Sequence, residues 1–396
     1  MDYTFSNKIS SLQPSAIREI LKATSNPEII PLAAGNPAPD AFPISEVQEI
    51  ASDILATRPI DALQYGVSEG YTPLRNTVKS WLKDRENIGT DNDDILILSG
   101  ATQAMDLTTK VLCNEGDVVI CENPSFIGSL NCFRSYGCKL VGVPVEADGM
   151  DVNALEEMLK ANSNAKFIYT IPNFQNPSGS TMSLEKRKRL YELAVEYSVI
   201  ILEDNPYGDL RVSGEKLPTI KSMDTEGIVL YAGSFSKILA PGLRVAYCVG
   251  PKQILAKMTV GKQASDTHTP CLNQMIVDEW FKKYDVEAHI TKIQGIYKKK
   301  LELMCDCIDR ELGDFVEYVR PEGGLFIWCK LPDDVNMTEF VKKAVEKKVA
   351  VVPGNAFLTD ENAETQYIRL NFSTPTDEGI INGVKALGEV AREYRR

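Results

Sequence analysis

Histidine is scarce in this chain, because its 396 residues include only His268 and His289. A metal site made of several histidines is therefore excluded, and neither histidine has a sequence neighbour that looks like a nucleophile. The nine cysteines form no Cys-x-x-Cys pair, and Cys305 and Cys307 stand too close together for a zinc site. Scattered cysteines are typical of core positions in a reducing, intracellular compartment. We expect no bound metal.

The sequence also has no basic block and no long apolar run. Its 43 lysines and arginines face 55 acidic residues, a net charge of −12, which disfavours binding to nucleic acid or to an anionic membrane. Residues 1–4 do not begin a basic segment followed by an apolar one, and no apolar run is long enough to span a bilayer. We therefore expect a cytoplasmic protein with no nucleic-acid or membrane partner.

From about residue 94, apolar strand-like runs alternate with helical segments. The predicted strands cover residues 95–98, 118–121, 139–143, 166–171, 199–202, 228–232 and 245–249. This alternation predicts an α/β fold with a mainly parallel sheet that helices cover on both faces. Ligands bind such sheets beyond the carboxyl ends of the strands.

The two ends of the chain differ from this pattern. Helices are predicted at 15–22 and 44–56, and a long helix at about 273–310 leads out of the sheet domain. After it, short strand-like and helical runs predict a small α+β domain that the N-terminal segment completes. We expect residues 46–290 to form the large domain, and residues 1–45 together with 291–396 to form the small one.

One lysine, Lys237, lies between two of the predicted buried strands. Ser234 and Ser236 precede it and Arg244 follows it, and these hydroxyl and guanidinium donors suit a phosphate dianion. A lysine in a Ser-x-Lys sequence is more often a solvated surface residue. Beside a phosphate site, however, its amine can condense with a phosphorylated aldehyde, which is how pyridoxal 5′-phosphate (PLP) is carried.

Other predicted strands end in residues that suit the same cofactor, and structural roles are the alternative for each of them. The turn at Ala101 and Thr102 opens a helix N-terminus, where anions bind. Asp204 ends an apolar strand and could keep the pyridine nitrogen of PLP protonated, which makes the ring an electron sink. The remaining candidates are Phe126 for ring stacking, and Asn176 and Tyr207 for the ring hydroxylate.

Three motifs carry a resemblance to a known family: Asn176-Pro177-Ser178-Gly179, Asp204-Asn205-Pro206-Tyr207, and Ser234-Phe235-Ser236-Lys237 with Arg244. They resemble the signature of the fold-type-I PLP aminotransferases of class I/II. Leu63-Gln64-Tyr65, Pro172-Asn173-Phe174-Gln175 and His268-Thr269-Pro270 are similar to the branch of 2-aminoadipate and kynurenine aminotransferases. The resemblance implies a large domain with a mainly parallel seven-stranded sheet, a small α+β domain, and a homodimer with shared active sites.

The resemblance also implies a role for each matching residue. Lys237 would hold PLP and shuttle a proton, and Asp204, Asn176 and Tyr207 would bind the ring. Arg369 would bind the substrate α-carboxylate with help from Gly35 and Asn176. The phosphate would be held by Ala101, Thr102, Ser234, Ser236, Arg244 and, from a neighbouring subunit, Tyr65.

The sequence departs from the family pattern at two positions. Phe126 stands where many relatives have tyrosine, and Ala101 stands where a serine is frequent. Arg18 lies in a segment that resembles one lining the side-chain pocket of 2-aminoadipate enzymes, so we expect it to bind a distal carboxylate, with a surface role as the alternative.

We therefore expect a PLP-dependent aminotransferase acting on an L-amino acid of 2-aminoadipate, glutamate or aromatic type, with a 2-oxo acid such as 2-oxoglutarate as acceptor. Two alternatives use the same cofactor residues. One is a C–S β-lyase acting on cysteine-type substrates. The other is a non-catalytic PLP-binding regulator, because this fold also occurs fused to a DNA-binding helix-turn-helix. We do not expect such a regulator here, since the first residues do not resemble a basic helical module of that kind.

Overall fold

The computed structural model describes residues 3–10, 12, 26, 28–360 and 362–394. Its largest sheet has the strand order β2-β9-β8-β7-β6-β3-β4-β5. The bounds of these strands are β2 Asp93–Leu98, β3 Val118–Asn123, β4 Lys139–Glu146, β5 Gly149–Met150, β6 Ala165–Thr170, β7 Ile200–Asp204, β8 Val229–Ser234 and β9 Ala246–Pro251.

Pairing along this sheet is mainly parallel. Strands β4, β3, β6, β7 and β8 run in the same direction, and β9 is antiparallel to both of its neighbours, β8 and β2. The α/β fold and seven predicted strands are confirmed. The two-residue β5, which pairs antiparallel with β4, adds an eighth strand that was not predicted.

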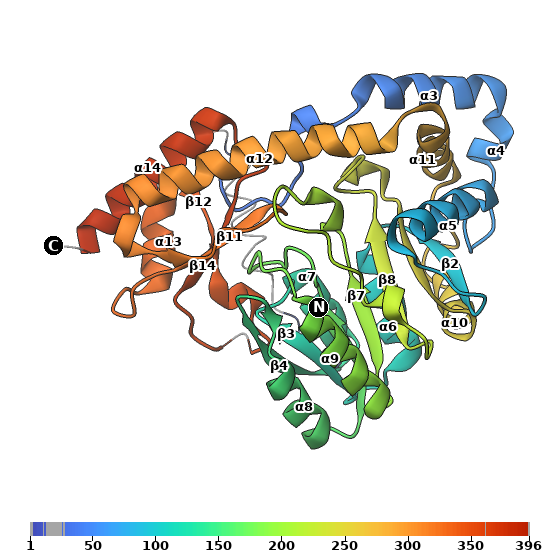
Figure 1. The fold of residues 1–396 in the computed structure, drawn as a ribbon, viewed down its shortest axis with the longest axis horizontal. Helices are drawn as coiled ribbons and strands as arrows, with labels where there is room; N and C mark the ends of the chain where they lie inside the picture. Colours follow the sequence, from blue (N-terminus) through green and yellow to red (C-terminus); the bar gives the residue numbers. More distant parts are fainter. Residues whose placement is uncertain (1–2, 11, 13–25, 27, 361, 395–396) are drawn as a thin grey trace.

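Helices cover both faces of the sheet (Figure 1). Alternate residues of β3, β6 and β7 point to opposite sides, as extended backbone requires. Ile120, Ile168 and Ile201 pack on the face covered by α8 and α9, and Cys121, Tyr169 and Leu202 belong to the core on the other face, with α6 and α7. The helices of this unit are α5 Thr72–Glu86, α6 Thr102–Leu112, α7 Ile127–Ser135, α8 Val152–Ala161, α9 Leu184–Glu196 and α10 Lys252–Gln263.

A second, antiparallel sheet has the order β10-β11-β14-β13, and β1 pairs in parallel with β12 beside it. Helix α12 packs against α14, and α14 packs against α13 (Figure 1). Residue 291, a predicted domain boundary, falls inside α12. The bounds are β1 Ile30–Pro31, β10 Glu317–Tyr318, β11 Phe326–Lys330, β12 Val349–Ala350, β13 Val352–Pro353, β14 Tyr367–Asn371, α12 Val286–Glu311, α13 Met337–Glu346 and α14 Asp377–Tyr394.

The single helix predicted at about 273–310 is wrong, because the structure has two helices there, α11 Cys271–Lys283 and α12. Asp285 caps α12 by accepting a hydrogen bond of 3.0 Å from the backbone N–H of Ala288, so the chain restarts the helix at that point. An aspartate at this position is a capping residue that can be recognised from the sequence.

The helix predicted at 15–22 lies outside the described residues. The other α-helices of the described residues are α1 Asn7–Ser10, α3 Ile44–Thr57 and α4 Pro59–Leu63, and α3 packs against α11.

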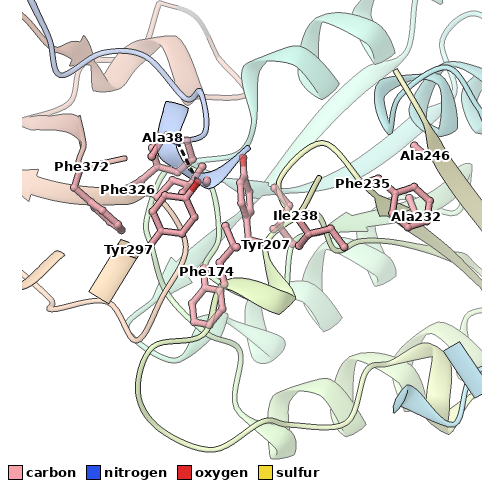
Figure 2. Packing of buried hydrophobic residues seen from close by; sticks show 14 of the residues in the cluster. Ala38, Phe174, Tyr207, Ala232, Phe235, Ile238, Ala246, Tyr297, Phe326 and Phe372 are labelled. Carbon is pink, nitrogen blue, oxygen red and sulfur yellow. Dashed lines mark hydrogen bonds between the residues drawn. The ribbon is translucent and has the colours of Figure 1, made fainter. Parts of the chain in front are cut away.

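Buried aromatic residues connect the two sheets near the carboxyl ends of β7 and β8. Figure 2 shows Tyr207, which follows β7, beside Phe326 of β11, and their rings meet edge to face at 5.8 Å. Tyr297 of α12 accepts a hydrogen bond of 3.1 Å from the backbone N–H of Ala38 in the N-terminal part (Figure 2). Among the described residues, no helix is both long and apolar enough to cross a lipid bilayer.

Candidate active site

The carboxyl ends of the parallel strands open into a cavity of about 370 Å³. Asp204 ends β7, Ser234 ends β8, and Lys237 follows β8 by three residues. Small-sheet residues Phe326 and Arg369 complete its wall. Twelve residues predicted from the sequence line this cavity: Gly35, Ala101, Thr102, Phe126, Asn176, Asp204, Tyr207, Ser234, Ser236, Lys237, Arg244 and Arg369.

Of the described residues that were predicted for the site, Tyr65 is not part of this lining. Tyr65 is 81% exposed, and its ring meets the ring of His268 at 5.8 Å in an edge-to-face contact. His268 Nε2 also accepts a hydrogen bond of 3.2 Å from the backbone N–H of Gly66, which holds the loop that carries Tyr65. Arg18 lies outside the described residues.

Lys237 projects its amine into the cavity between the two sheets. Nζ donates a hydrogen bond of 2.8 Å to the carbonyl oxygen of Gly35 and lies 5.9 Å from the centre of the Tyr207 ring. Burial lowers the pKa of Lys237 to about 8, and the positive charges of Arg369 and Arg244 act in the same direction. This amine can therefore gain and lose a proton near neutral pH.

Asp204 is 3% exposed and has two inequivalent carboxylate oxygens. Oδ2 accepts a hydrogen bond of 2.8 Å from the hydroxyl of Tyr169, whereas buried Oδ1 has no hydrogen-bond partner within the described chain. Burial raises the pKa of Asp204 to about 7, and the bond from Tyr169 opposes that rise. A buried acceptor left open is costly unless a ligand satisfies it, so Oδ1 is a candidate ligand contact.

Arg369 on β14 is 4% exposed and forms no ion pair with a carboxylate of the described residues. Its Nη1 donates a hydrogen bond of 2.8 Å to Asn176 Oδ1, its Nη2 donates one of 2.9 Å to the carbonyl oxygen of Ala33, and its buried Nε has no partner there. The guanidinium lies over the rings of Phe326 and Phe357, at 4.2 and 4.8 Å. A buried cation without a counter-charge is a site for an incoming anion.

Asn176 links Arg369 to Tyr207. Its Nδ2 donates a hydrogen bond of 3.4 Å to the hydroxyl of Tyr207, while its Oδ1 faces Arg369. Burial raises the pKa of Tyr207, so its hydroxyl stays protonated across the physiological range. The cavity thus presents the neutral hydroxyl of Tyr207 as a donor beside the cationic groups of Lys237 and Arg369.

At the other end of the cavity, the turn before α6 packs directly on Arg244. Gly100 has φ +100°, and a Cβ at this position would lie 1.8 Å from Arg244 Nη2. Arg244 Nη2 also donates a hydrogen bond of 3.2 Å to the carbonyl oxygen of Ser99, and Ser234 Oγ accepts one of 3.1 Å from the backbone N–H of Ser236. Helix N-terminus, hydroxyls and guanidinium are together the kinds of donor that bind an anion, and we call this end of the cavity the anion site.

The structure adds site residues that sequence reasoning missed. Lys262, which is fully buried, binds Gln103 Oε1 at 2.7 Å and Asp266 at 2.9 Å, and Gln103 Oε1 accepts a bond of 2.9 Å from the backbone N–H of Ser99. This network fixes the turn at the anion site. Tyr169 was missed because a tyrosine in an apolar strand reads as core. Only its alternation, which places it on the same face of the sheet as Asp204, could have revealed it.

Comparison with known proteins gives consistent results. Residues 27–387 match the family described as aminotransferase class I and II. The chain is 40% identical to aromatic-amino-acid aminotransferase 1 of Thermococcus litoralis (99% of this chain, 95% of the relative) and 39% identical to 2-aminoadipate transaminase of Thermus thermophilus (98% and 96%). A crystal structure of Pyrococcus horikoshii kynurenine aminotransferase in complex with PMP aligns with a TM-score of 0.95 at 39% identity (99% of this chain, 98% of that chain).

These matches extend over almost the whole chain. They confirm the predicted fold type I, the aminotransferase activity with PLP as cofactor, and the branch of 2-aminoadipate and kynurenine aminotransferases. The chain therefore belongs to the aminotransferase class I and II family.

Proposed function

We propose that this enzyme transfers the amino group of an aromatic or 2-aminoadipate-type L-amino acid to a 2-oxo acid such as 2-oxoglutarate, with Lys237 as the residue that carries the cofactor. One observation supports this most directly. A single cavity brings together the amine of Lys237, an unpartnered oxygen of Asp204 and the uncompensated cation of Arg369. These groups match the aldehyde, the ring nitrogen and the substrate carboxylate of a transamination.

The residues present fit PLP. The Oδ1 of Asp204, which has no partner among the described residues, offers the acceptor that a protonated ring nitrogen requires. Glycine at position 100 lets the guanidinium of Arg244 pack directly against the turn before α6, where the phosphate would bind. Phe126 lines the cavity and offers a ring face for stacking. Asn176 and Tyr207 would bind the ring oxygen. When bound, PLP supplies an electron sink that stabilises negative charge at the substrate Cα.

Lys237 would move the proton. Because its pKa is lowered to about 8, the free Nζ could take a proton from the substrate Cα and deliver it to C4′ of the cofactor in the same cavity. The carbonyl oxygen of Gly35 accepts a hydrogen bond from this amine and would orient it. Burial between the sheets would restrict the access of water.

Arg369 would bind the α-carboxylate of the substrate. Its guanidinium is held by Asn176 and Ala33 and by two aromatic rings, so it is already oriented before a ligand arrives. Gly35 lines the same cavity and would help to orient this carboxylate. A Cβ at Gly35 would lie 3.2 Å from Phe326 and crowd the ring on which Arg369 packs. Binding would thus position the Cα–H bond toward Lys237.

The phosphate of the cofactor would occupy the anion site. Backbone N–H groups at Ala101 and Thr102 would bind it together with Ser234, Ser236 and Arg244. Tyr65 projects into solvent rather than into the cavity of its own chain, which supports a role in the site of a neighbouring subunit. We propose a homodimer with shared active sites that works in the cytoplasm. Each subunit would consist of a large domain at 46–290 and a small domain from 1–45 and 291–396.

Side-chain selection would depend on the apolar part of the cavity and on Arg18. Ile127, Met105 and Phe326 are apolar residues that line the cavity, and they would suit an aromatic or aliphatic side chain. Arg18 would bind a distal carboxylate. The related enzymes named for aromatic amino acids and for 2-aminoadipate support both preferences.

The test combines a donor screen with labelling of the lysine. Purified protein with PLP should convert an aromatic amino acid or 2-aminoadipate to its 2-oxo acid while 2-oxoglutarate becomes glutamate, and borohydride should fix the cofactor on Lys237. Labelling at another residue would overturn the assignment of Lys237. Release of pyruvate and ammonia from a sulfur amino acid would indicate a C–S lyase instead, and cofactor binding without turnover of any donor would indicate a regulator.

A further inference from the structure

A buried tyrosine, Tyr169, lies behind the acid of the active site. It belongs to β6, next to the strand that ends in Asp204, and the register pairs Tyr169 with Leu202, two residues before Asp204. The Tyr169 hydroxyl donates a hydrogen bond of 2.8 Å to Asp204 Oδ2 and accepts one of 2.8 Å from Ser129 Oγ of α7. The three residues form a chain of hydrogen bonds that ends at the carboxylate.

This chain determines which oxygen of Asp204 is available. Ser129 donates to the Tyr169 oxygen, so the single hydroxyl proton of Tyr169 is committed to Oδ2. Oδ1 then remains the oxygen without a partner among the described residues. Tyr169 cannot turn away easily, because it is fully buried and its ring packs edge to face on Phe133 at 5.3 Å.

The charged and titratable groups around the pair do not offer Tyr169 another partner. Glu122 of β3, also buried, accepts its hydrogen bonds from Thr170, Gln175 and the backbone of Ile171. Burial raises the pKa of Tyr169, and the negative charges of Asp204 and Glu122 act in the same direction, so the Tyr169 hydroxyl keeps its proton. Tyr207, on the cavity side, bonds to Asn176. Donation from Tyr169 is therefore the direct stabilisation that the Asp204 carboxylate receives.

We propose that Tyr169, supported by Ser129, is a positioning residue that keeps Asp204 ionised and reserves Oδ1 for a protonated ring nitrogen. This inference rests on the proposed function, in which Asp204 binds the ring nitrogen of the cofactor. It adds a specific consequence: the preference of the site for a pyridine ring over a benzene ring of the same shape depends on a hydroxyl outside the cofactor contacts.

The experiment compares two ligands of the full-length enzyme after removal of its cofactor. One is pyridoxamine phosphate, and the other is its carbocyclic analogue, in which CH replaces the ring nitrogen. Wild type should bind pyridoxamine phosphate more tightly. Tyr169→Phe should reduce this preference by about 10- to 100-fold, because it removes a hydrogen bond to a charged group, while affinity for the analogue stays within about twofold.

Two further variants complete the design. Ser129→Ala should lower the preference in the same direction by a smaller factor, and it carries the test if Tyr169→Phe does not fold. Tyr136→Phe is the matched control, because the Tyr136 hydroxyl also donates to a carboxylate, Asp106, at 2.6 Å, but outside the cavity. Its ligand preference should equal that of wild type.

The outcomes separate this inference from the proposed function. If wild type binds both ligands equally, Asp204 does not bind the ring nitrogen, so the proposed roles of Asp204 and Tyr169 both fail while the amino-transfer reaction is still judged by the donor screen. If wild type prefers pyridoxamine phosphate and Tyr169→Phe keeps that preference, the role of Tyr169 alone is overturned. Equal weakening of both ligands by Tyr169→Phe would assign the residue a packing role, which also overturns the inference.

Discussion

Arg369 and Asn176 share a hydrogen bond of 2.8 Å that joins the small sheet to the loop after β6. Asn176 in turn bonds to Tyr207, which follows β7. One amide side chain therefore connects the group proposed to bind the substrate with a group proposed to bind the cofactor ring. The position of the Arg369 guanidinium is therefore coupled to the position of the Tyr207 hydroxyl.

Replacement of Arg369 by lysine should weaken the recognition of amino acids. Lysine keeps the charge but loses the planar fork, and it leaves Asn176 Oδ1 and the carbonyl oxygen of Ala33 without their present donors. We expect kcat/KM for the amino donor to fall about 30-fold or more, which corresponds to about 2–5 kcal/mol for a buried charge pair. Steady-state kinetics with an amine that lacks the carboxylate provides the control, and an equal loss with that amine would contradict the role.

The lowered pKa of Lys237 should appear in the stability of the cofactor-free protein. Its pKa drops from an ordinary 10.5 to about 8 on folding, so between these values the unfolded chain binds more protons. The resulting destabilisation is complete below about pH 8 and disappears as the pH approaches 10.5. Urea unfolding of both proteins measures this effect. The free energy of unfolding of Lys237→Met minus that of wild type should be larger below about pH 8 than near pH 10, by on the order of 2 kcal/mol.

The control for this measurement is Lys257→Met, because Lys257 is an exposed lysine on α10. It measures the effect of losing an exposed lysine over the same pH range. If the stability difference between Lys237→Met and wild type does not change with pH, the proposed environment of the Lys237 amine is contradicted.

Much of the site could be predicted because its residues stand at the ends of apolar runs. Asp204 ends a strand and Lys237 follows one, and in a parallel sheet all such ends meet at the same edge. Local sequence therefore carried the position of both groups. Tyr169 and Lys262 could not be predicted in the same way, since their roles depend on neighbours distant in the sequence, Asp204 and Gln103. Phe326 likewise reads as an ordinary core residue of its strand.

Alanine at Gly100 should disturb the anion site. The new Cβ would lie 1.8 Å from Arg244 Nη2 at a backbone φ of +100°, so Arg244 must move. Gly89→Ala is a close control, because Gly89 has φ +105° and nothing within 4 Å of the added Cβ. Both variants should lose about 1–3 kcal/mol of unfolding free energy from backbone strain. Only Gly100→Ala should also weaken PLP binding, by about tenfold or more, in a fluorescence titration. Equal PLP affinity in the two variants would argue against a phosphate contact by Arg244.

The role of Arg18 can be read from substrate preference. If its guanidinium binds a distal carboxylate, Arg18→Ala should raise KM for 2-aminoadipate and glutamate about tenfold or more and leave KM for aromatic donors nearly unchanged. Arg18→Lys should recover part of the loss, since it restores the charge. Equal effects on acidic and aromatic donors would place Arg18 outside the side-chain pocket.

Mixed dimers test whether Tyr65 acts across the subunit boundary. Tyr65 is 81% exposed and does not line the cavity of its own chain. If the proposed homodimer shares its active sites, Tyr65→Ala homodimers should bind PLP several-fold more weakly, because the phosphate would lose a contact. A hybrid of a Tyr65→Ala subunit with a Lys237→Ala subunit has one site in which intact Lys237 meets an intact Tyr65 from the partner. That site should bind PLP with wild-type affinity and be active. If Tyr65 instead served its own chain, the only site with a lysine would lack Tyr65, and the hybrid would keep the weakened affinity of the Tyr65→Ala homodimer.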